Sequence, residues 1–236
     1  MENNWKNKKQ LLQYGFLQTL PVLCGYLFLG MAFGVLLQKA GYGIVWAFLI
    51  SLVVYAGSMQ FVLISLLTSG ANLLTVALMT LSINSRHIFY GLSFIEKFQS
   101  MGKKGLYMIA SLTDETYSVL CGMKIPKNLE KEEKTLFFVV AVLNHLYWII
   151  GSVLGAGIGQ VLPFDTTGID FAMTALFVVI YIEQWLGAKD KFPAILGMSF
   201  AILSLVLFGR QNFLLPALVG TVCVLWIRSS NEKVVL

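Results

Sequence analysis

The sequence predicts an all-α polytopic membrane protein with about six spanning helices and two further discontinuous or re-entrant helical segments. Of its 236 residues, 57% are hydrophobic and only 12% are charged, and the mean hydropathy is +0.76. Soluble domains carry roughly 25% charged residues and need that polar surface to cover their cores. The lysines gather in short segments between apolar runs, so the net charge of +5 indicates cytoplasmic loops rather than a nucleic-acid partner.

Eight apolar segments approach the length of about 20 residues that a spanning helix needs. The first is too long for the apolar part of a signal peptide and no A-x-A cleavage site follows it, so we expect it to be retained. No linker or change in composition divides the chain, which predicts one integral membrane domain over residues 1–236 with a cytoplasmic lead-in over 1–15. The segments cover residues 16–38, 44–68, 71–95, 105–122, 135–160, 168–186, 192–208 and 213–227.

The segment 44–68 looks interrupted at its centre, where the sequence reads YAGSMQ. Gly57 and Ser58 weaken a helix, and Gln60 is polar. Backbone that leaves the helix inside a membrane is tolerated only where it is buried in protein or lines a cavity. An alternative is a simple packing kink with no further role.

The segment 105–122 looks interrupted in the same way, because SLTDETYS places Asp114 and Glu115 at its centre. One of these acids could neutralise a buried cation and leave the other free to carry a proton. The alternative is a second, purely structural ion pair. Adjacent residues on a helix point about 100° apart, so the two acids need not share a task.

The distribution of lysine favours a topology in which these two segments dip into the membrane and return. If all eight segments spanned, the loop 96–104 with its three lysines would lie outside the cell. If 44–68 and 105–122 each return to the side they entered from, loop 96–104 and the lysine-rich stretch 123–134 both become cytoplasmic. Both termini are then cytoplasmic as well.

Glycine spacing predicts close contacts between helices. Gly30 and Gly34 form one GxxxG motif, and Gly151, Gly155 and Gly159 form two overlapping ones. Residues four apart share a helix face, and the missing side chains let two backbones approach closely. We therefore expect a GxxxG-packed bundle.

The stretch SINSRHIFYG, residues 82–91, places Arg86 and His87 inside an apolar run. At a helix centre an arginine costs roughly 2.5–3.5 kcal/mol, and such residues usually face a bundle interior or a watery cavity. On a helix, Asn84, His87 and Gly91 share one face while Arg86 and Tyr90 share the next. This polar stripe could line a cavity, or Arg86 could simply tie helices together.

No cofactor or metal site is predicted. His87 and His145 have no third ligand at a suitable spacing, and the three cysteines show no CxxC motif. A Walker A motif is also missing from the sequence, so we expect no ATP hydrolysis by this chain.

Three elements together resemble the AzlC-type subunits of branched-chain amino acid exporters: AGSMQ (56–60), NSRHIFYG (84–91) and LTDE (112–115). The resemblance implies a secondary transporter in the plasma membrane, not an enzyme, that exports leucine, isoleucine, valine and analogues such as azaleucine. It also implies a small AzlD-type membrane subunit as partner. By motif matching, the residues carried over are Gln60, Arg86, His87, Tyr90, Asp114 and Glu115.

The expected roles follow from the chemistry of an amino acid substrate. Arg86, or the interrupted helix at Gly57 and Ser58, would receive the substrate carboxylate. Asp114 or Glu115 would meet the ammonium group or carry a proton down its gradient. Two other functions stay open, namely a passive channel and an intramembrane serine hydrolase using Ser58 with His145 or His87.

Overall fold

The computed structural model describes residues 2–161 and 190–234, together with residues 178, 181, 182, 185, 186 and 188. The described residues form helices, with no β-strand among them, which confirms the predicted all-helical class. They fall into two compact units, residues 1–174 and 175–236. The predicted segment 168–186 lies mostly outside the described residues. Among the described residues, three helices are long and apolar enough to cross a membrane, within Lys9–Lys39, Lys127–Val161 and Phe192–Gly209.

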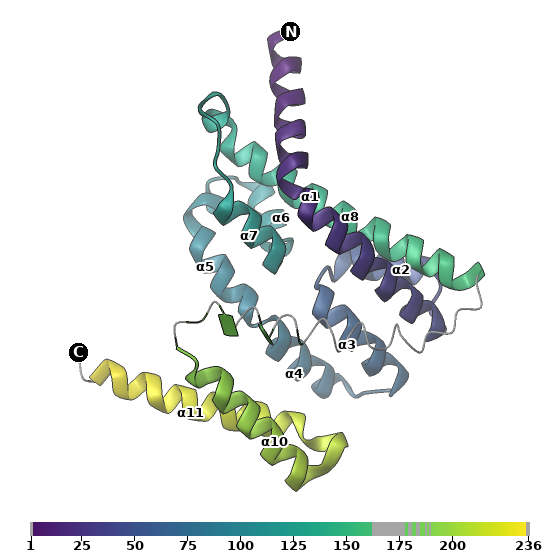
Figure 1. Cartoon of the computed structure of the whole chain (residues 1–236), viewed down its shortest axis with the longest axis vertical. Coiled ribbons are helices and arrows are strands. Elements are labelled where there is room, and N and C mark those ends of the chain that lie inside the picture. The colour runs from purple at the N-terminus through teal and green to yellow at the C-terminus, as the bar shows by residue number, and fades with distance from the viewer. Residues whose placement is uncertain are drawn as a thin grey trace. The chain divides into compact units, whose positions relative to one another are not determined.

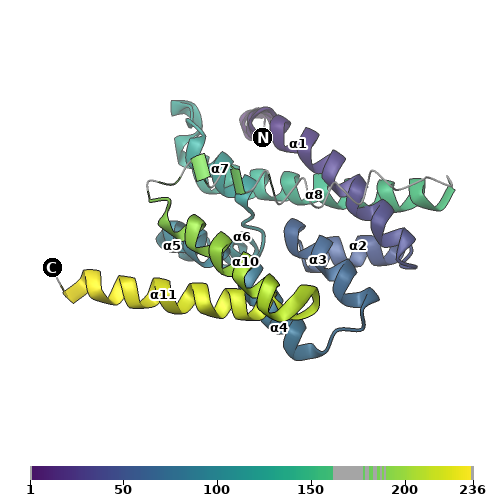
Figure 2. The same cartoon turned by 60° about the horizontal axis from the view of Figure 1, so that its bottom comes forward.

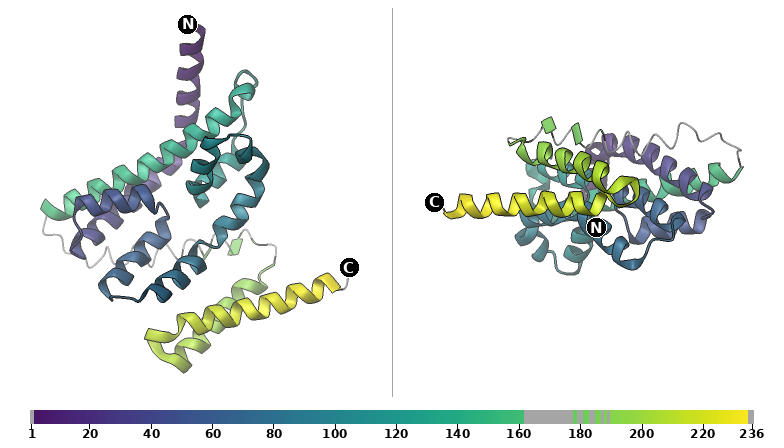
Figure 3. Two further views of the ribbon diagram at one scale, coloured as in Figure 1. Left: turned by 180° about the vertical axis from the view of Figure 1, so that it is seen from behind. Right: turned by 90° about the horizontal axis from the view of Figure 1, so that it is seen from below.

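Helices α1 (Glu2–Lys39) and α8 (Glu133–Val161) run side by side in the same direction in the first unit (Figures 1 and 3). A Cβ added to Gly15 would lie 3.0 Å from Val139, and one added to Gly159 would lie 3.3 Å from Val35. Residue numbers therefore rise together along the two helices. Near the start of α8, the Tyr14 hydroxyl of α1 donates to the carbonyl of Lys124, in the segment that precedes α8.

Glycines make the closest approach between α1 and α8. A Cβ added to Gly34 would lie 2.1 Å from the carbonyl oxygen of Ser152, and one added to Gly155 would lie 2.1 Å from that of Met31. Both distances are far below van der Waals contact, so only glycine fits at either position. Gly30 and Gly151 complete the contact, with an added Cβ at Gly151 only 3.2 Å from the Cα of Gly30.

The predicted interruption of segment 44–68 is present, and it separates α2 (Ile44–Val53) from α3 (Gly57–Thr68). Tyr55, inside the interruption, has φ 38° and is the single non-glycine residue with positive φ among those described. Such a backbone costs of order 1–3 kcal/mol and persists only where the surroundings hold it. The break thus falls just before Gly57 and Ser58, which begin the new helix.

Helices α2 and α3, joined at this interruption, are called the first hairpin here, and α2 begins at the C-terminal end of α8. Helix α2 starts beside Gly157 of α8. A Cβ added to Gly157 would lie 3.8 Å from the Ile44 side chain. It ends near His145, whose Nε2 lies 3.1 Å from the Ser51 carbonyl oxygen. Helix α3 then turns away from α2 (Figures 1 and 2), and its Phe61 ring meets Phe33 far along α1.

Helices α4 (Leu73–Asn84) and α5 (Arg86–Gln99) carry the chain back toward the start of α8. Asn72 caps α4 by accepting a hydrogen bond from the Thr75 amide at 2.9 Å. Beyond the end of α4, Lys97 of α5 lies 2.6 Å from Glu133, the first residue of α8.

The single helix expected over 71–95 is divided at Ser85. This residue keeps helical dihedrals, so the division is a local turn rather than a full break. The Ser85 hydroxyl donates to the carbonyl of Ser82 at 3.0 Å, in the way that serine competes with helical hydrogen bonding. Asn84 therefore ends α4 and Arg86 begins α5.

The second predicted interruption is also present, between α6 (Lys103–Ala110) and α7 (Asp114–Gly122). The Thr113 side chain accepts from the Thr116 amide at 3.3 Å and so caps α7. Helix α6 runs with α8 as far as the contact of Tyr107 with His145. Helix α7 runs back toward the start of α8, where it continues through the short helix η1 (Lys127–Glu132). This second hairpin enters and leaves at the N-terminal end of α8.

The second unit contains α10 (Phe192–Asn212) and α11 (Leu214–Val234). They coincide with the predicted segments 192–208 and 213–227. Gly209 kinks the end of α10 with φ 71°. Arg228 of α11 lies 2.9 Å from Asp190 and 4.5 Å above the ring of Phe192, which joins the two helices.

Candidate functional site

The interruptions of the two hairpins face the same short stretch of α8. The Tyr55 ring of the first hairpin stacks on His145, with ring centres 4.0 Å apart. Thr116 of the second hairpin accepts a hydrogen bond from Asn144 at 3.0 Å. Asn144 is the middle residue of the span Lys127–Val161. Two hairpins from opposite ends therefore meet halfway along α8.

Gln60 holds the first hairpin together. Its Oε1 accepts from the Ala56 amide at 3.2 Å and from the Trp148 indole at 2.8 Å. Its Nε2 donates to the Ser51 hydroxyl at 3.3 Å, across the interruption. The side chain is fully buried. Gln60, a predicted substrate residue, thus ties α2, α3 and α8 to one another through its own polar atoms.

His145 links the two hairpins. Its Nε2 lies 3.1 Å from the carbonyl oxygen of Ser51, which belongs to the last turn of α2. Its Nδ1 lies 2.9 Å from the Tyr107 hydroxyl on α6. The last carbonyls of a helix lack partners inside the helix, so the imidazole satisfies one of them. Both ring nitrogens are therefore engaged.

A run of hydrogen-bonded groups connects the second hairpin to α1 and α8. The Tyr26 hydroxyl donates to Glu115 Oε2 at 2.7 Å and lies 2.7 Å from the Thr113 hydroxyl. Thr113 Oγ1 lies 3.1 Å from Thr116 Oγ1. Thr116 in turn accepts from the amide nitrogen of Asn144 at 3.0 Å. One carboxylate is thus joined to one amide through three hydroxyl groups.

Two buried polar atoms beside this run have no hydrogen-bond partner within the described part of the chain. They are the Tyr55 hydroxyl and Asn144 Oδ1. The Tyr55 hydroxyl lies close to the hydroxyls of Tyr26 and Thr116. Over 90% of buried polar groups in proteins are paired, so these two atoms are exceptions within an otherwise satisfied cluster.

The two acids of the second hairpin face different helices, as their adjacent positions predict. Glu115 meets Tyr26 of α1, whereas Asp114 lies 3.9 Å from His87 of α5. Tyr90, one turn after His87, stacks on Tyr117 of α7 with ring centres 4.6 Å apart.

Two further residues of the predicted stripe are Arg86 and Asn84. The side chain of Arg86 lies outside the described residues. Asn84 Oδ1 is buried, and no hydrogen-bond partner is present for it in the described portion of the chain.

Ser58 and Gly57 lie at the start of α3, close to α8. Ser58 is buried, and a Cβ added to Gly57 would lie 3.2 Å from the Trp148 ring. The structure thus brings Gly57, Ser58 and Gln60 to one hairpin and Asp114 and Glu115 to the other.

Sequence reasoning missed several residues of this region. Tyr26 gave no signal, because a single tyrosine in an apolar helix usually packs without a special role. Tyr55, Thr113 and Thr116 lie inside the stretches YAGSMQ and SLTDETYS but were not singled out there. Asn144 gave a weak signal, because it is a polar amide within a predicted spanning segment.

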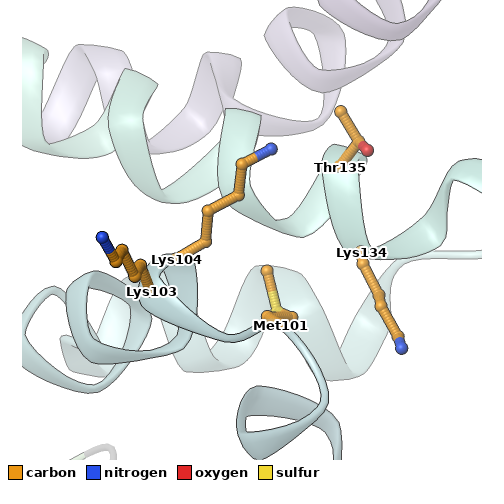
Figure 4. A pocket seen from close by; sticks show the side chains of 5 residues that line it. All are labelled: Met101, Lys103, Lys104, Lys134 and Thr135. Carbon is orange, nitrogen blue, oxygen red and sulfur yellow. The ribbon is translucent and has the colours of Figure 1, made fainter.

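A cavity of about 350 Å³ lies elsewhere, at the N-terminal end of α8. Figure 4 shows that the amino groups of Lys103, Lys104 and Lys134 point away from one another around it. Diverging ammonium groups do not form a convergent anion site. Within the described residues, no three His, Cys, Asp or Glu side chains are placed to hold a metal ion.

Interrupted helices that meet at a buried polar cluster inside an apolar helical protein are the architecture of membrane transport proteins. Residues 21–162 match the family described as AzlC protein. The chain belongs to this family.

The relatives agree with this assignment. The chain is 39% identical to the branched-chain amino acid transport protein AzlC of Bacillus subtilis, over 92% of this chain and 85% of that protein. It is 39% identical to an uncharacterized membrane protein of Haemophilus influenzae, over 90% of this chain and 87% of the relative. Identity to the inner membrane protein YgaZ of Escherichia coli is 27%, over 72% of each chain. No solved structure matches.

Proposed function

We propose that this chain exports leucine, isoleucine, valine and their analogues across the plasma membrane, driven by the proton gradient and together with a small AzlD-type membrane subunit. The observation that carries the proposal is the meeting of two interrupted hairpins at a buried polar cluster. A relative 39% identical over most of the chain bears the name of a branched-chain amino acid transport protein. Interrupted helices supply polar backbone groups that hold a charged amino acid inside a membrane.

The proposed topology has six spanning helices, two re-entrant hairpins and both termini in the cytoplasm. Its support is the parallel course of α1 and α8, with lysine-rich segments beside the start of α8. In this topology both hairpins return to the side of the membrane from which they enter. Lipid would cover the exposed apolar faces of these helices, and glycine contacts of the kind seen between α1 and α8 would pack the bundle.

The substrate carboxylate would bind at the start of α3, or at Arg86. Helix α3 begins at Gly57 and Ser58, so the positive end of its dipole lies at this position. Glu115 and Asp114 would meet the ammonium group or carry the proton. The remaining proposed residues, which shape or couple this region, are Gln60, Asn84, His87 and Tyr90.

Two other functions make different predictions. A serine hydrolase built on Ser58 would need a histidine base, yet both nitrogens of His145 are already engaged. Labelling of Ser58 by a fluorophosphonate probe would favour the hydrolase, with His87 as its base. A passive channel would release leucine at a rate independent of the proton gradient.

The test measures efflux of labelled leucine, valine and methionine from cells with and without the small subunit, at two external pH values. Arg86→Ala should abolish efflux while the protein stays in the membrane. Lys104→Ala is the matched control, because it removes an exposed lysine far from the hairpin interruptions. Normal efflux from Arg86→Ala would contradict the proposed role of Arg86, and absence of efflux from wild-type cells would contradict the function itself.

A further inference from the structure

His87 and Asp114 form a titratable pair where α5 faces the start of α7. His87 Nε2 lies 3.9 Å from Asp114 Oδ1, and the two side chains are 27% and 29% exposed. Imidazole is the side chain that ordinarily changes its charge between pH 5 and 8. Asp114 is the first residue of α7, directly after the interruption of the second hairpin. A group that titrates near neutral pH therefore lies beside a carboxylate of the proposed transport site.

We propose that His87 binds the coupling proton, and that its imidazolium competes with the ammonium group of the amino acid substrate for the Asp114 carboxylate. The inference rests on the proposed function and narrows the roles of the two acids. The proton and the substrate cation are assigned to two different residues of one pair, and Glu115 takes no part in proton binding.

The neighbours of the two acids separate their roles. Glu115 Oε2 accepts a hydrogen bond from the Tyr26 hydroxyl at 2.7 Å, and Tyr26 is buried on the α1 surface that packs on α8. A tyrosine hydroxyl keeps its proton at physiological pH, so Tyr26 brings no change of charge to Glu115. Asp114 instead faces an imidazole, which gains and loses a proton in that range. Of the two acids, Asp114 is the one whose neighbour responds to a proton gradient.

The exchange moves one proton for one substrate molecule. With His87 protonated, the imidazolium faces the Asp114 carboxylate. When this proton leaves to water, the imidazole becomes neutral, and the substrate ammonium approaches the same carboxylate. Two positive charges within about 4 Å of each other repel, so the imidazolium and the ammonium group disfavour each other at Asp114. Each ligand therefore weakens the binding of the other, which is the coupling that antiport requires.

The pair has room to close when His87 is protonated. A separation of 3.9 Å is longer than a hydrogen bond. Beyond the first turn of α5, aromatic contacts hold this helix against α7, because Tyr90 stacks on Tyr117 at 4.6 Å and Phe94 meets the same ring at 5.8 Å. The first turn of α5 follows the division at Ser85. Closing of the pair is therefore confined to the short stretch between this division and Tyr90.

Other titratable or charged groups surround His87 within the described part of the first unit. Helix α4 contributes none of them. The side chain of Arg86, next in the chain, lies outside the described residues. Helices α5, α6, α7 and α8 contribute Tyr90, Tyr107, Asp114, Glu115, Tyr117 and His145.

These groups differ from His87 in how they titrate. Tyrosine and arginine keep their protons at physiological pH. Both ring nitrogens of His145 are engaged, by Tyr107 and by the Ser51 carbonyl. At the other end of α5, Lys97 is paired with Glu133 at 2.6 Å. His87 is therefore the imidazole whose charge can change beside Asp114.

The first test measures the pH dependence of leucine binding by the full chain with its small subunit in vesicles, from pH 5 to 8. When one proton competes with one substrate, the half-saturating leucine concentration rises about tenfold per pH unit below the midpoint of the titration. His87→Gln should remove this rise and abolish accumulation driven by a proton gradient. Gln99→Ala is the matched control at an exposed position of the same helix, and it should keep the rise. Glu115→Gln should keep the same slope at whatever affinity it retains.

The outcomes separate the inference from the proposed function. A slope that persists in His87→Gln, or that disappears in Glu115→Gln, would overturn the assignment of the proton to His87 while leaving leucine transport intact. Failure of wild type to bind leucine at any pH would instead overturn the proposed function, and the inference with it.

A second test needs no substitution at His87. The chain has 2 histidines, so selective isotope labelling of histidine gives two sets of imidazole signals in an NMR titration. Leucine at about ten times its half-saturating concentration should lower the midpoint of His87 by about one pH unit. The signal of His145 should not respond, because both its nitrogens are bonded. Midpoints that leucine leaves unchanged in both signals would overturn the inference.

The ammonium group is tested with two analogues of leucine that displace the labelled substrate. In wild type, 3-methylbutylamine, which keeps the ammonium group, should bind more weakly at acid pH by the same factor as leucine. The analogue 4-methylpentanoate, which lacks that group, should not. Asp114→Asn should weaken binding of the amine by about tenfold and leave the carboxylate analogue unaffected. Equal effects on both analogues would overturn the competition at Asp114.

Discussion

Gly155→Ala should destabilise the protein by separating α1 from α8. The new Cβ would lie 2.1 Å from the Met31 carbonyl oxygen and 2.5 Å from the Met31 Cα. Both atoms belong to backbone, so no side chain can rotate out of the way. Real Cβ atoms essentially never lie closer than 3.0 Å to another heavy atom. The two helices must therefore separate by about 0.9 Å to accommodate the new Cβ.

The magnitude follows from two opposed effects. Overpacking of this kind costs about 1–3 kcal/mol, and contact with backbone places this case near 3 kcal/mol. Alanine in a helix interior recovers about 1 kcal/mol relative to glycine. The expected net loss in the free energy of unfolding is therefore about 2 kcal/mol.

Gly157→Ala is the control, two residues along the same helix. Its new Cβ would meet only the tip of Ile44, at 3.8 Å. This variant should gain up to about 1 kcal/mol from helix propensity alone. Denaturation of the purified proteins by SDS in mixed micelles, followed by tryptophan fluorescence, measures both changes. Equal stability of Gly155→Ala and Gly157→Ala would refute the view that backbone contact holds α1 against α8.

Two further predictions concern the hairpins. Gln60→Leu leaves the Trp148 indole buried without its acceptor and should cost about 2 kcal/mol of unfolding free energy by the same assay, whereas an unchanged value would show that Gln60 does not brace the hairpin. A single cysteine at Ser100 should react only with reagents applied to the cytoplasmic side and one at Ser69 only from outside, and the reverse pattern would contradict the proposed topology.

The sequence predicts the interruptions well, because they depend on local chemistry. Glycine and serine at 57–58 and two acids at 114–115 cannot easily continue a lipid-facing helix. The structure moves each break a few residues upstream, to Tyr55 and to 111–113. A residue that weakens a helix interior often makes a good first turn, so these residues begin the helices that follow.

The neighbours of each interruption could not be predicted, because they depend on the path of the chain after the break. Whether α3 continues or returns is decided by contacts far apart in sequence, such as Phe61 with Phe33. Tyr26 joins the polar region only because α1 and α8 pack closely at their glycines. A Cβ added to Gly151 would lie 3.2 Å from the Cα of Gly30. A single tyrosine in the sequence does not indicate such a contact between helices.

The hydrogen-bond partners of the exposed helix ends distinguish structural residues from functional ones. Each interruption leaves carbonyl and amide groups that must be paired inside a membrane. His145 pairs with the carbonyl of Ser51 and Gln60 with the amide of Ala56, so each satisfies a backbone group that the interruption exposes. Asn144 differs, because only its nitrogen is used and its buried oxygen is left over. Polarity inside the apolar run therefore identifies residues that the broken helices require.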